Sequence, residues 1–207
     1  MPSPRFSFNR RALLTSLGAS LLVFTLAACG KSEASLQDIH GIDLSEASFG
    51  DGFQLKDADG NVRTLDDFKG KVVLMFFGFT QCPDVCPTAL VNASQIKSLL
   101  GPDGDKLQVL FITVDPERDT PEVLREYAQA FDPSFIGLYG DAQETAAVAK
   151  AYRVYYAKVP TGNSYTIEHT ALTYVFDRSG QLRMALRHEQ TAEESAEDIR
   201  KVLALGA

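Results

Sequence analysis

A long apolar run leads directly into two cysteines in the stretch Val72-Val-Leu-Met-Phe-Phe-Gly-Phe-Thr-Gln-Cys82-Pro-Asp-Val-Cys86-Pro-Thr88. The run 72–77 has no polar side chain, as expected of a strand that is buried on both faces of a sheet. Pro87 suits the first turn of a helix, where the N–H that proline lacks is not needed. The stretch therefore predicts a buried strand, a loop with two cysteines, and a helix that ends near Gly101-Pro102.

The sequence on either side alternates between strand and helix patterns. The expected elements are a hairpin at 53–65, strands at 107–114 and 135–139, helices at 121–131 and 142–151, an extended piece at 165–167, a hairpin at 172–186 and a closing amphipathic helix at 192–205. Such alternation predicts an α/β fold in which a central mixed sheet is flanked by helices. The position of the cysteine pair, between the first long strand and its helix, makes this a thioredoxin-like fold.

The first 28 residues have the parts of an export signal. Arginines 5, 10 and 11 precede an apolar run from Ala12 to Ala28, and Leu26-Ala-Ala-Cys29 closes that run. We interpret 1–28 as a lipoprotein signal peptide, Cys29 as the acylated first residue, 29–48 as a lipid-anchored flexible tether, and 49–207 as one thioredoxin-like domain. An uncleaved membrane anchor is the alternative, and Arg10-Arg11 weakly resembles a twin-arginine signal.

The charge of the chain bears on its partners. Residues 1–28 hold three of the 20 basic residues and none of the 27 acidic ones, so the remainder has a net charge of about −10. Nucleic acid requires basic patches, and we therefore expect no nucleic-acid partner. Acyl chains would hold the protein to the membrane. We expect an exported bacterial lipoprotein whose domain lies on the periplasmic or extracytoplasmic side.

The two cysteines of the loop admit several chemistries. Cys86 stands where the helix begins, so the helix dipole is expected to lower the pKa of its thiol. Cys82 lies close enough to form a disulfide with Cys86, to open it again, or to bind a metal with it. An inert structural disulfide is the plain alternative, but a bridge that closes so short a loop constrains little of the unfolded chain.

A histidine would complete a metal site. Three residues separate the cysteines, where thioredoxin-type enzymes have two, and a Cys, Cys, His set suits copper, both Cu(I) and Cu(II). Zinc would accept the same ligands but prefers a fourth. His169 precedes the predicted 172–186 hairpin, His40 falls in the predicted tether, and His188 sits among charged residues. A lone histidine is more often a core or surface residue, so placement alone makes His169 only a candidate.

The motifs together resemble the Sco/SenC family of copper-handling proteins. The matching segments are Phe76-Phe-Gly-Phe-Thr-Gln-Cys82-Pro-Asp-Val-Cys86-Pro-Thr88, Thr113-Val-Asp-Pro-Glu-Arg-Asp-Thr-Pro121, Tyr152-Arg-Val-Tyr-Tyr156 and Glu168-His169-Thr170. The resemblance spans residues from about 45 to 205. It implies a thioredoxin-like fold, copper binding by Cys82, Cys86 and His169, and a role in building the dinuclear copper centre of cytochrome c oxidase subunit II. Glu168 departs from the family's usual aspartate.

The sequence leaves two functions open. The first is a copper metallochaperone, with cytochrome c oxidase subunit II as target and an exported copper donor as source. The second is a thiol–disulfide oxidoreductase that reduces the target's cysteines. A thiol reductant would then reduce its own cysteine pair again. His169 favours the first, because a dithiol reductase needs no third ligand. A third function, peroxidase activity, is disfavoured, because it requires an arginine beside a reactive thiolate and the sequence shows no such grouping.

Residues at the end of the second long strand have two readings. Asp115 either ends that strand and accepts turn hydrogen bonds, or lies beside the copper site at the sheet edge where ligands gather. Arg118 and Asp119 are expected to pair with each other or to cap the helix.

Overall fold

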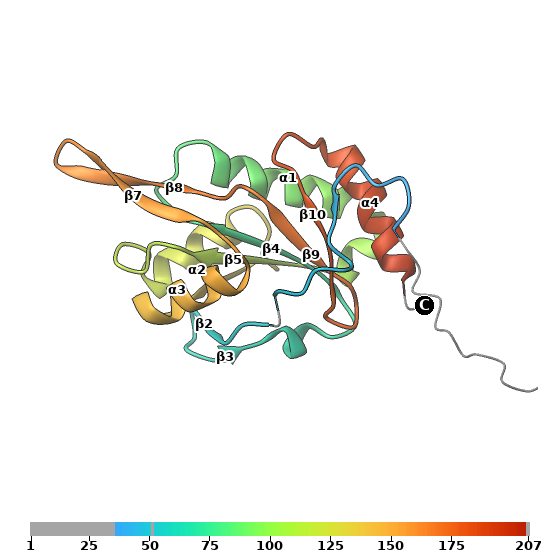
Figure 1. The fold of residues 1–207 in the computed structure, drawn as a ribbon, viewed down its shortest axis with the longest axis horizontal. Helices are drawn as coiled ribbons and strands as arrows, with labels where there is room; N and C mark the ends of the chain where they lie inside the picture. The colour runs from blue at the N-terminus through green and yellow to red at the C-terminus, as the bar shows by residue number, and fades with distance from the viewer. Residues whose placement is uncertain (1–35, 51, 206–207) are drawn as a thin grey trace, which may run out of the picture. The chain divides into compact units, whose positions relative to one another are not determined.

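The computed structural model describes residues 36–50 and 52–205, and in this part of the chain an eight-stranded mixed sheet is flanked by helices (Figure 1). The strands follow the order β1-β10-β9-β4-β5-β6-β2-β3. Their bounds are β1 Ile42–Asp43, β2 Leu55–Asp57, β3 Val62–Arg63, β4 Val72–Gly78, β5 Leu107–Thr113, β6 Ile136–Tyr139, β9 Thr173–Phe176 and β10 Leu182–Leu186.

Strands β4 and β5 form the middle of the sheet. All seven residues of each strand are buried, and the two strands run parallel from the Val72–Leu107 pair to the Gly78–Thr113 pair. β6 continues the parallel part beside β5, whereas β9 pairs antiparallel with the other edge of β4. The continuous apolar runs are thus explained, because both faces of these strands are covered.

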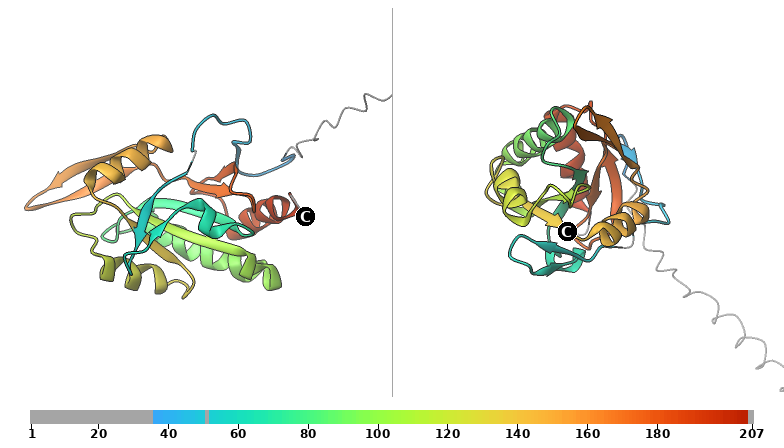
Figure 2. Two further views of the ribbon diagram at one scale, coloured as in Figure 1. Left: turned by 90° about the horizontal axis from the view of Figure 1, so that it is seen from below. Right: turned by 90° about the vertical axis from the view of Figure 1, so that its left-hand side faces the viewer.

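Helices cover both faces of the sheet. They are α1 Val85–Leu99, α2 Pro121–Gln129, α3 Ala142–Ala151 and α4 Ala192–Ala204. α1 packs against α4, and the end-on view in Figure 2 shows α1 and α2 on one side of the sheet and α3 on the other. Ring contacts agree, since Phe111 of β5 lies 5.3 Å from Tyr127 of α2, and Phe77 of β4 lies 5.8 Å from Tyr152 after α3. The predicted thioredoxin-like fold is confirmed.

A second, two-stranded sheet was predicted only in part. β7 (Tyr156–Thr161) and β8 (Ser164–His169) form a hairpin that extends away from the main sheet (Figures 1 and 2). The sequence predicted only the 165–167 piece of this hairpin. Most residues of β7 are at least partly exposed, and Pro160 interrupts the pattern, so no buried face marks the strand in the sequence.

The folded part begins earlier than predicted. Leu36 is buried, β1 pairs with β10, and the backbone N–H groups of His40 and Gly41 donate to the buried carboxylate of Asp198 in α4. Residues 36–48 therefore do not form the flexible tether that their polar, small-residue composition suggested. Strand pairing and a buried acceptor hold them against the domain.

The predicted signal peptide 1–28 and the acylated Cys29 lie outside the described residues. Within 36–50 and 52–205, no helix combines the length and the apolar character needed to cross a membrane.

Candidate metal centre

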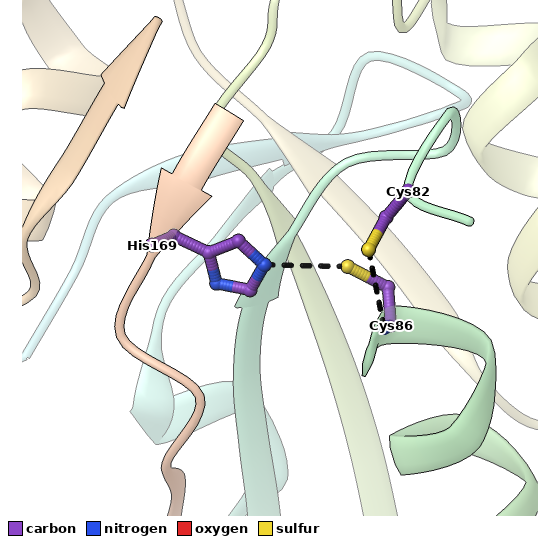
Figure 3. Close-up of side chains that lie close together, drawn as sticks. All are labelled: Cys82, Cys86 and His169. Carbon is purple, nitrogen blue, oxygen red and sulfur yellow. Dashed lines mark hydrogen bonds between the residues drawn. The ribbon is translucent and has the colours of Figure 1, made fainter. Parts of the chain in front are cut away.

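Three potential ligands from distant parts of the sequence meet at one end of the central strands (Figure 3). Cys82 lies in the loop after β4, Cys86 in the first turn of α1, and His169 is the last residue of β8. Their sulfur and ring-nitrogen atoms all lie within 4.8 Å of one another, and no other such group of three His, Cys, Asp or Glu side chains is found among the described residues. The predicted ligand set is thus assembled by the fold.

The position of Cys86 depends on a glycine at the end of β4. Cys86 is fully buried. A Cβ atom added to Gly78 would lie 2.8 Å from the Cys86 sulfur and 2.7 Å from the ring of Phe111. Contacts this short force atoms to move, so the absence of a side chain at position 78 is what leaves room for the sulfur.

The start of α1 directs its unpaired N–H groups at the other cysteine. The helix N-cap, Asp84, makes no side-chain capping hydrogen bond. Instead the backbone N–H of Cys86 donates to the sulfur of Cys82 at 3.4 Å, as Figure 3 shows. The Cys82 sulfur thus takes the place of a capping group, and the positive end of the helix faces it.

The two thiols consequently differ in acidity. A hydrogen bond from Cys86 lowers the pKa of Cys82 to about 5, with further help from backbone N–H groups and His169 and against the opposing effect of partial burial. The hydrogen bond with Cys82 and burial raise the pKa of Cys86. The sequence-based expectation that Cys86 is the acidic thiol was therefore wrong. The helix N-terminus stabilises a charge on Cys82, and a second charge beside it in a buried position is unfavourable.

His169 presents one ring nitrogen to the cysteines. Its Nδ1 lies 3.0 Å from the carbonyl oxygen of Thr170, which can only accept a hydrogen bond, so Nδ1 carries the proton. Nε2 lies 3.5 Å from the Cys86 sulfur (Figure 3), and in the neutral ring with its proton on Nδ1 it has a lone pair for a metal. The rings of Phe76 and Phe79 contact the imidazole edge-on, at 5.8 and 6.0 Å between centroids. This tautomer is the one a metal ligand requires.

The chemistry of these donors fits copper. Two sulfur atoms and one imidazole are soft donors, whereas magnesium, calcium and manganese prefer oxygen ligands. Zinc favours four ligands, and the cluster found in the described part of the chain supplies three. Neither cysteine is in a disulfide here. A reduced cysteine can lose its proton and bind a metal as a thiolate.

The turn after β5 differs from the sequence-based expectation. Arg118 pairs with Asp115 rather than with Asp119, and neither caps the helix, because Thr120 is the N-cap, as the sequence Thr120-Pro121-Glu122 predicted. The Asp119 carboxylate accepts hydrogen bonds from the hydroxyl groups of Thr113 and Thr80, both at 2.6 Å, and from the backbone N–H of Thr80. Asp119 thereby ties the cysteine-bearing loop to the end of β5.

Asp115 is fully buried, and of its two predicted roles the structure shows that of a turn acceptor. Its backbone carbonyl accepts turn hydrogen bonds from residues 118 and 119, and its carboxylate accepts one from the hydroxyl of Tyr165, which precedes His169 on the same strand. Asp115 forms no hydrogen bond with Cys82, Cys86 or His169. Its link to the site runs through the hairpin.

The remaining candidates stay away from the cluster. His40 contacts Glu197 on α4 at 3.2 Å, and His188 is partly exposed after β10. Glu168 is exposed on the face of β8 opposite to His169. Sequence analysis missed Gly78, Asp119 and Tyr165. Of these three, only Tyr165 could have been found from the sequence, because it lies four residues before His169 and residues four apart in a strand share a face.

Comparisons with known proteins show the family of the chain. The SCO1/SenC family model matches residues 43–204. The chain is 36% identical over 173 residues to the SCO2-like protein of Rickettsia felis, covering 82% of this chain and 83% of that protein. It is 38% identical over 200 residues to the mitochondrial SCO2 homolog of Bos taurus, covering 94% of this chain and 75% of that protein.

Solved structures with copper bound resemble the fold. The structure of Bradyrhizobium japonicum ScoI with copper bound is 46% identical with a TM-score of 0.69, covering 75% of this chain and all of that one. Yeast Sco1 with copper bound is 37% identical with a TM-score of 0.68, covering 74% of this chain and 87% of that one. The chain belongs to the SCO1/SenC family.

Proposed function

We propose that this protein is a copper metallochaperone that binds one copper ion through Cys82, Cys86 and His169 and helps to assemble the dinuclear copper centre of cytochrome c oxidase subunit II. The observation that carries the proposal is the convergence of two cysteine sulfurs and one imidazole nitrogen within 4.8 Å. Relatives with copper bound and the family's role in cytochrome c oxidase assembly support it.

The protonation states of the free site suit the uptake of a cation. Cys82 is a thiolate at neutral pH because its pKa is about 5. The Cys86 proton lies between two acceptors, the Cys82 sulfur and His169 Nε2. Binding of copper would replace that proton, so uptake releases about one proton at neutral pH. Cys82 is only partly buried, which leaves its sulfur accessible for ligand exchange with a partner's thiolates.

Thiol–disulfide exchange is the second candidate function, and the unequal thiols favour it. The Cys82 thiolate would attack a disulfide of the target and form a mixed disulfide, releasing one target thiolate. Cys86 would then lose its proton and attack the Cys82 sulfur, forming the Cys82–Cys86 disulfide and releasing the second target thiolate. An exported thiol reductant would return the pair to two thiols.

The proposed location follows from the N-terminal sequence. Cys29 would be acylated after removal of residues 1–28, and acyl chains would anchor the protein to the membrane with its domain on the extracytoplasmic side. The region from Cys29 to the start of the described structure at Leu36 would join lipid to domain. Copper would come from an exported donor chaperone.

Metal competition under anaerobic conditions tests the copper proposal. The reduced protein is exposed to equal amounts of copper and zinc, separated from unbound metal and analysed. We expect one copper per chain and little zinc, and no copper uptake after the cysteine pair has been oxidised. Equal loading of oxidised and reduced protein, or preferential loading with zinc, would rule out a dithiolate copper site.

A further inference from the structure

The β7–β8 hairpin needs an attachment of its own to hold His169 in place. Its two strands pair with each other and with no strand of the main sheet in the described part of the chain. Near its base, Tyr155 and Thr170 exchange hydrogen bonds, but these lie within the segment that forms the hairpin. Sheet pairing therefore does not set the distance between His169 and the cysteines.

The turn after β5 supplies the attachment through Tyr165. The Arg118 guanidinium carbon lies 3.8 Å from the centre of the Tyr165 ring, within the range of a cation–π contact. Arg118 Nη1 also donates to the backbone carbonyl of Tyr165 at 2.9 Å, and the Tyr165 hydroxyl donates to Asp115 at 2.8 Å. Three contacts of different kinds thus join one hairpin residue to one turn. We name Asp115, Arg118 and Tyr165 the clasp.

The clasp acts on the face of the hairpin that carries the ligand. Side chains alternate along a strand, so Tyr165, Ile167 and His169 share a face of β8, and Ile167 between them is buried. On the partner strand, Lys158 lies opposite Ile167 and forms an ion pair with Glu117 of the same turn at 2.6 Å. That outer pair is exposed and contributes little by itself.

Within the clasp, Arg118 is held on two sides. Its Nε donates to the carboxylate of Asp115, which is fully buried, and the guanidinium also lies 5.9 Å from the ring centre of Phe79. Its Nη2 atom is buried without a hydrogen-bond partner. A buried ion pair is weak evidence for stability, because desolvation offsets the attraction. Its clearest consequence here is geometric, since it fixes the guanidinium against the ring of Tyr165.

We propose that Tyr165 and Arg118 are positioning residues that place His169 Nε2 opposite Cys86 and so preset the third copper ligand. The inference rests on the proposed copper function. Neither residue forms a hydrogen bond with Cys82, Cys86 or His169. Tyr165 acts through the hairpin that carries His169, whereas Arg118 contacts that hairpin and also donates to Gln81 of the cysteine loop at 3.1 Å.

The substitution Tyr165→Leu tests the clasp, because it removes the ring and the hydroxyl from a partly exposed site without leaving a cavity in the core. Copper affinity is measured on the full chain by competition with a chelator. Loss of such an outer partner typically weakens metal binding 10–100-fold, and we expect a loss of about tenfold. Tyr155→Leu is the matched control, since Tyr155 is 62% exposed and its hydrogen bonds with Thr170 use only backbone atoms of Tyr155. It should bind copper like the unmodified protein.

A double-mutant cycle shows whether Tyr165 acts through His169. His169→Ala alone should weaken copper binding, and adding Tyr165→Leu should weaken it no further. Full additivity of the two losses, or unchanged affinity in Tyr165→Leu while His169→Ala weakens binding, would overturn the positioning role. If His169→Ala itself has no effect, the proposed copper site fails instead.

The metal-free protein gives a readout that does not depend on copper. Tyr165→Leu should accelerate hydrogen exchange of the backbone amides of β7 and β8 relative to Tyr155→Leu, while amides of β4 and β5 stay unchanged. Tyr165→Phe keeps the ring under Arg118 and should restore most of the protection and most of the affinity. Equal exchange in the Leu variants at positions 165 and 155 would show that the clasp does not hold the hairpin.

Discussion

At the scale of single residues, the two cysteines of the site have different environments although only three residues separate them. The Cys82 sulfur receives a backbone N–H from the start of α1, whereas the Cys86 sulfur is buried under Gly78. The sequence indicated a helix start near the pair, but not which sulfur its N–H groups would face. That depends on the path of the loop, which residue patterns do not reveal.

The acidity of Cys82 should be visible in its alkylation. With a pKa of about 5, the thiolate fraction of Cys82 rises as pH increases through 5 and is nearly complete at pH 7. The rate of iodoacetamide modification at Cys82, followed by mass spectrometry, should therefore level off within about a unit above that pKa. Cys86, whose pKa is raised by Cys82 and by burial, should stay nearly unmodified at pH 7 in the unmodified protein. A faster reaction at Cys86 than at Cys82 would reverse the assignment.

Gly78→Ala should destabilise the protein and disturb the site together. The added methyl group would clash with the Cys86 sulfur and with Phe111. Overpacking of this kind costs about 1–3 kcal/mol in the free energy of unfolding. Chemical denaturation measures that loss, and copper titration should show weaker binding because the sulfur must move. Unchanged stability would mean that the end of β4 is less crowded than the structure shows.

Prediction from sequence was uneven among the site residues. Cys82 and Cys86 were identified by the strand before them and the helix after them. His169 was a weak candidate by placement and became a strong one through the resemblance to the Sco/SenC family. Asp119 and Gly78 could not be assigned from the sequence, because their roles consist of contacts with residues that are distant in the chain or packed from another element.

At the scale of elements, two hairpin turns are held by the same arrangement of a buried aspartate and an arginine. Asp57 is the last residue of β2, and Asp177 directly follows β9. Each accepts hydrogen bonds from the backbone of the following turn and forms an ion pair with the arginine six residues later. Both aspartates are buried. The recurring arrangement ties each turn to its returning strand by a satisfied buried carboxylate, which is costly to leave unpaired.

Asp177→Asn should lower stability in a pH-dependent manner. Burial raises the pKa of Asp177, but hydrogen bonds from Ser179, Arg183 and the turn backbone outweigh it and hold the pKa below 3.8. The carboxylate therefore stabilises the fold above about pH 3.8, and this contribution is lost as pH falls through the lowered pKa. At neutral pH we expect the variant to lose about 1–3 kcal/mol, because Arg183 loses its charged partner.

Denaturation of Asp177→Asn at several pH values measures this effect. Its deficit against the unmodified protein should shrink below pH 3.8. Asp66→Asn is the control, because the Asp66–Lys69 pair is exposed and should contribute less than 1 kcal/mol. A deficit for Asp177→Asn that does not change with pH would contradict the carboxylate's role.

The elements themselves were predictable in proportion to their burial. β4 and β5 have uninterrupted apolar runs, and α2 has its Thr120 cap followed by Pro121. β1 has two residues and gains its stability from pairing with β10, so no local pattern marks it. β7 has no continuous buried face. Strands that are stabilised mainly by pairing with a strand distant in the sequence cannot be predicted from local residue patterns.

At the scale of the whole molecule, the proposed anchor at Cys29 would determine where the site can act. Leu36 already belongs to the folded domain, so an anchor at Cys29 would be joined to the domain by fewer residues than the predicted 29–48 tether. A domain on a short link would work close to the membrane surface, where subunit II of the oxidase would have to present its copper centre.

Cys29→Ser tests the proposed anchor. The variant should be released from membranes or incompletely processed, because stable anchoring needs more than one acyl chain and serine takes none. Fractionation and N-terminal sequencing measure this, and copper binding per folded chain should stay unchanged. A mature N-terminus other than residue 29, or an intact residue 1 in the membrane fraction, would replace the lipoprotein with a signal-anchored protein.

The absorption spectrum of the Cu(II)-loaded protein tests most directly whether Cys82, Cys86 and His169 are the copper ligands. Thiolate ligation produces intense sulfur-to-copper charge-transfer bands. We expect these bands in the unmodified protein and in His188→Ala, a shifted and weakened spectrum in His169→Ala, and no bands in Cys82→Ser/Cys86→Ser. A His169→Ala spectrum identical to that of the unmodified protein would contradict the three-ligand site.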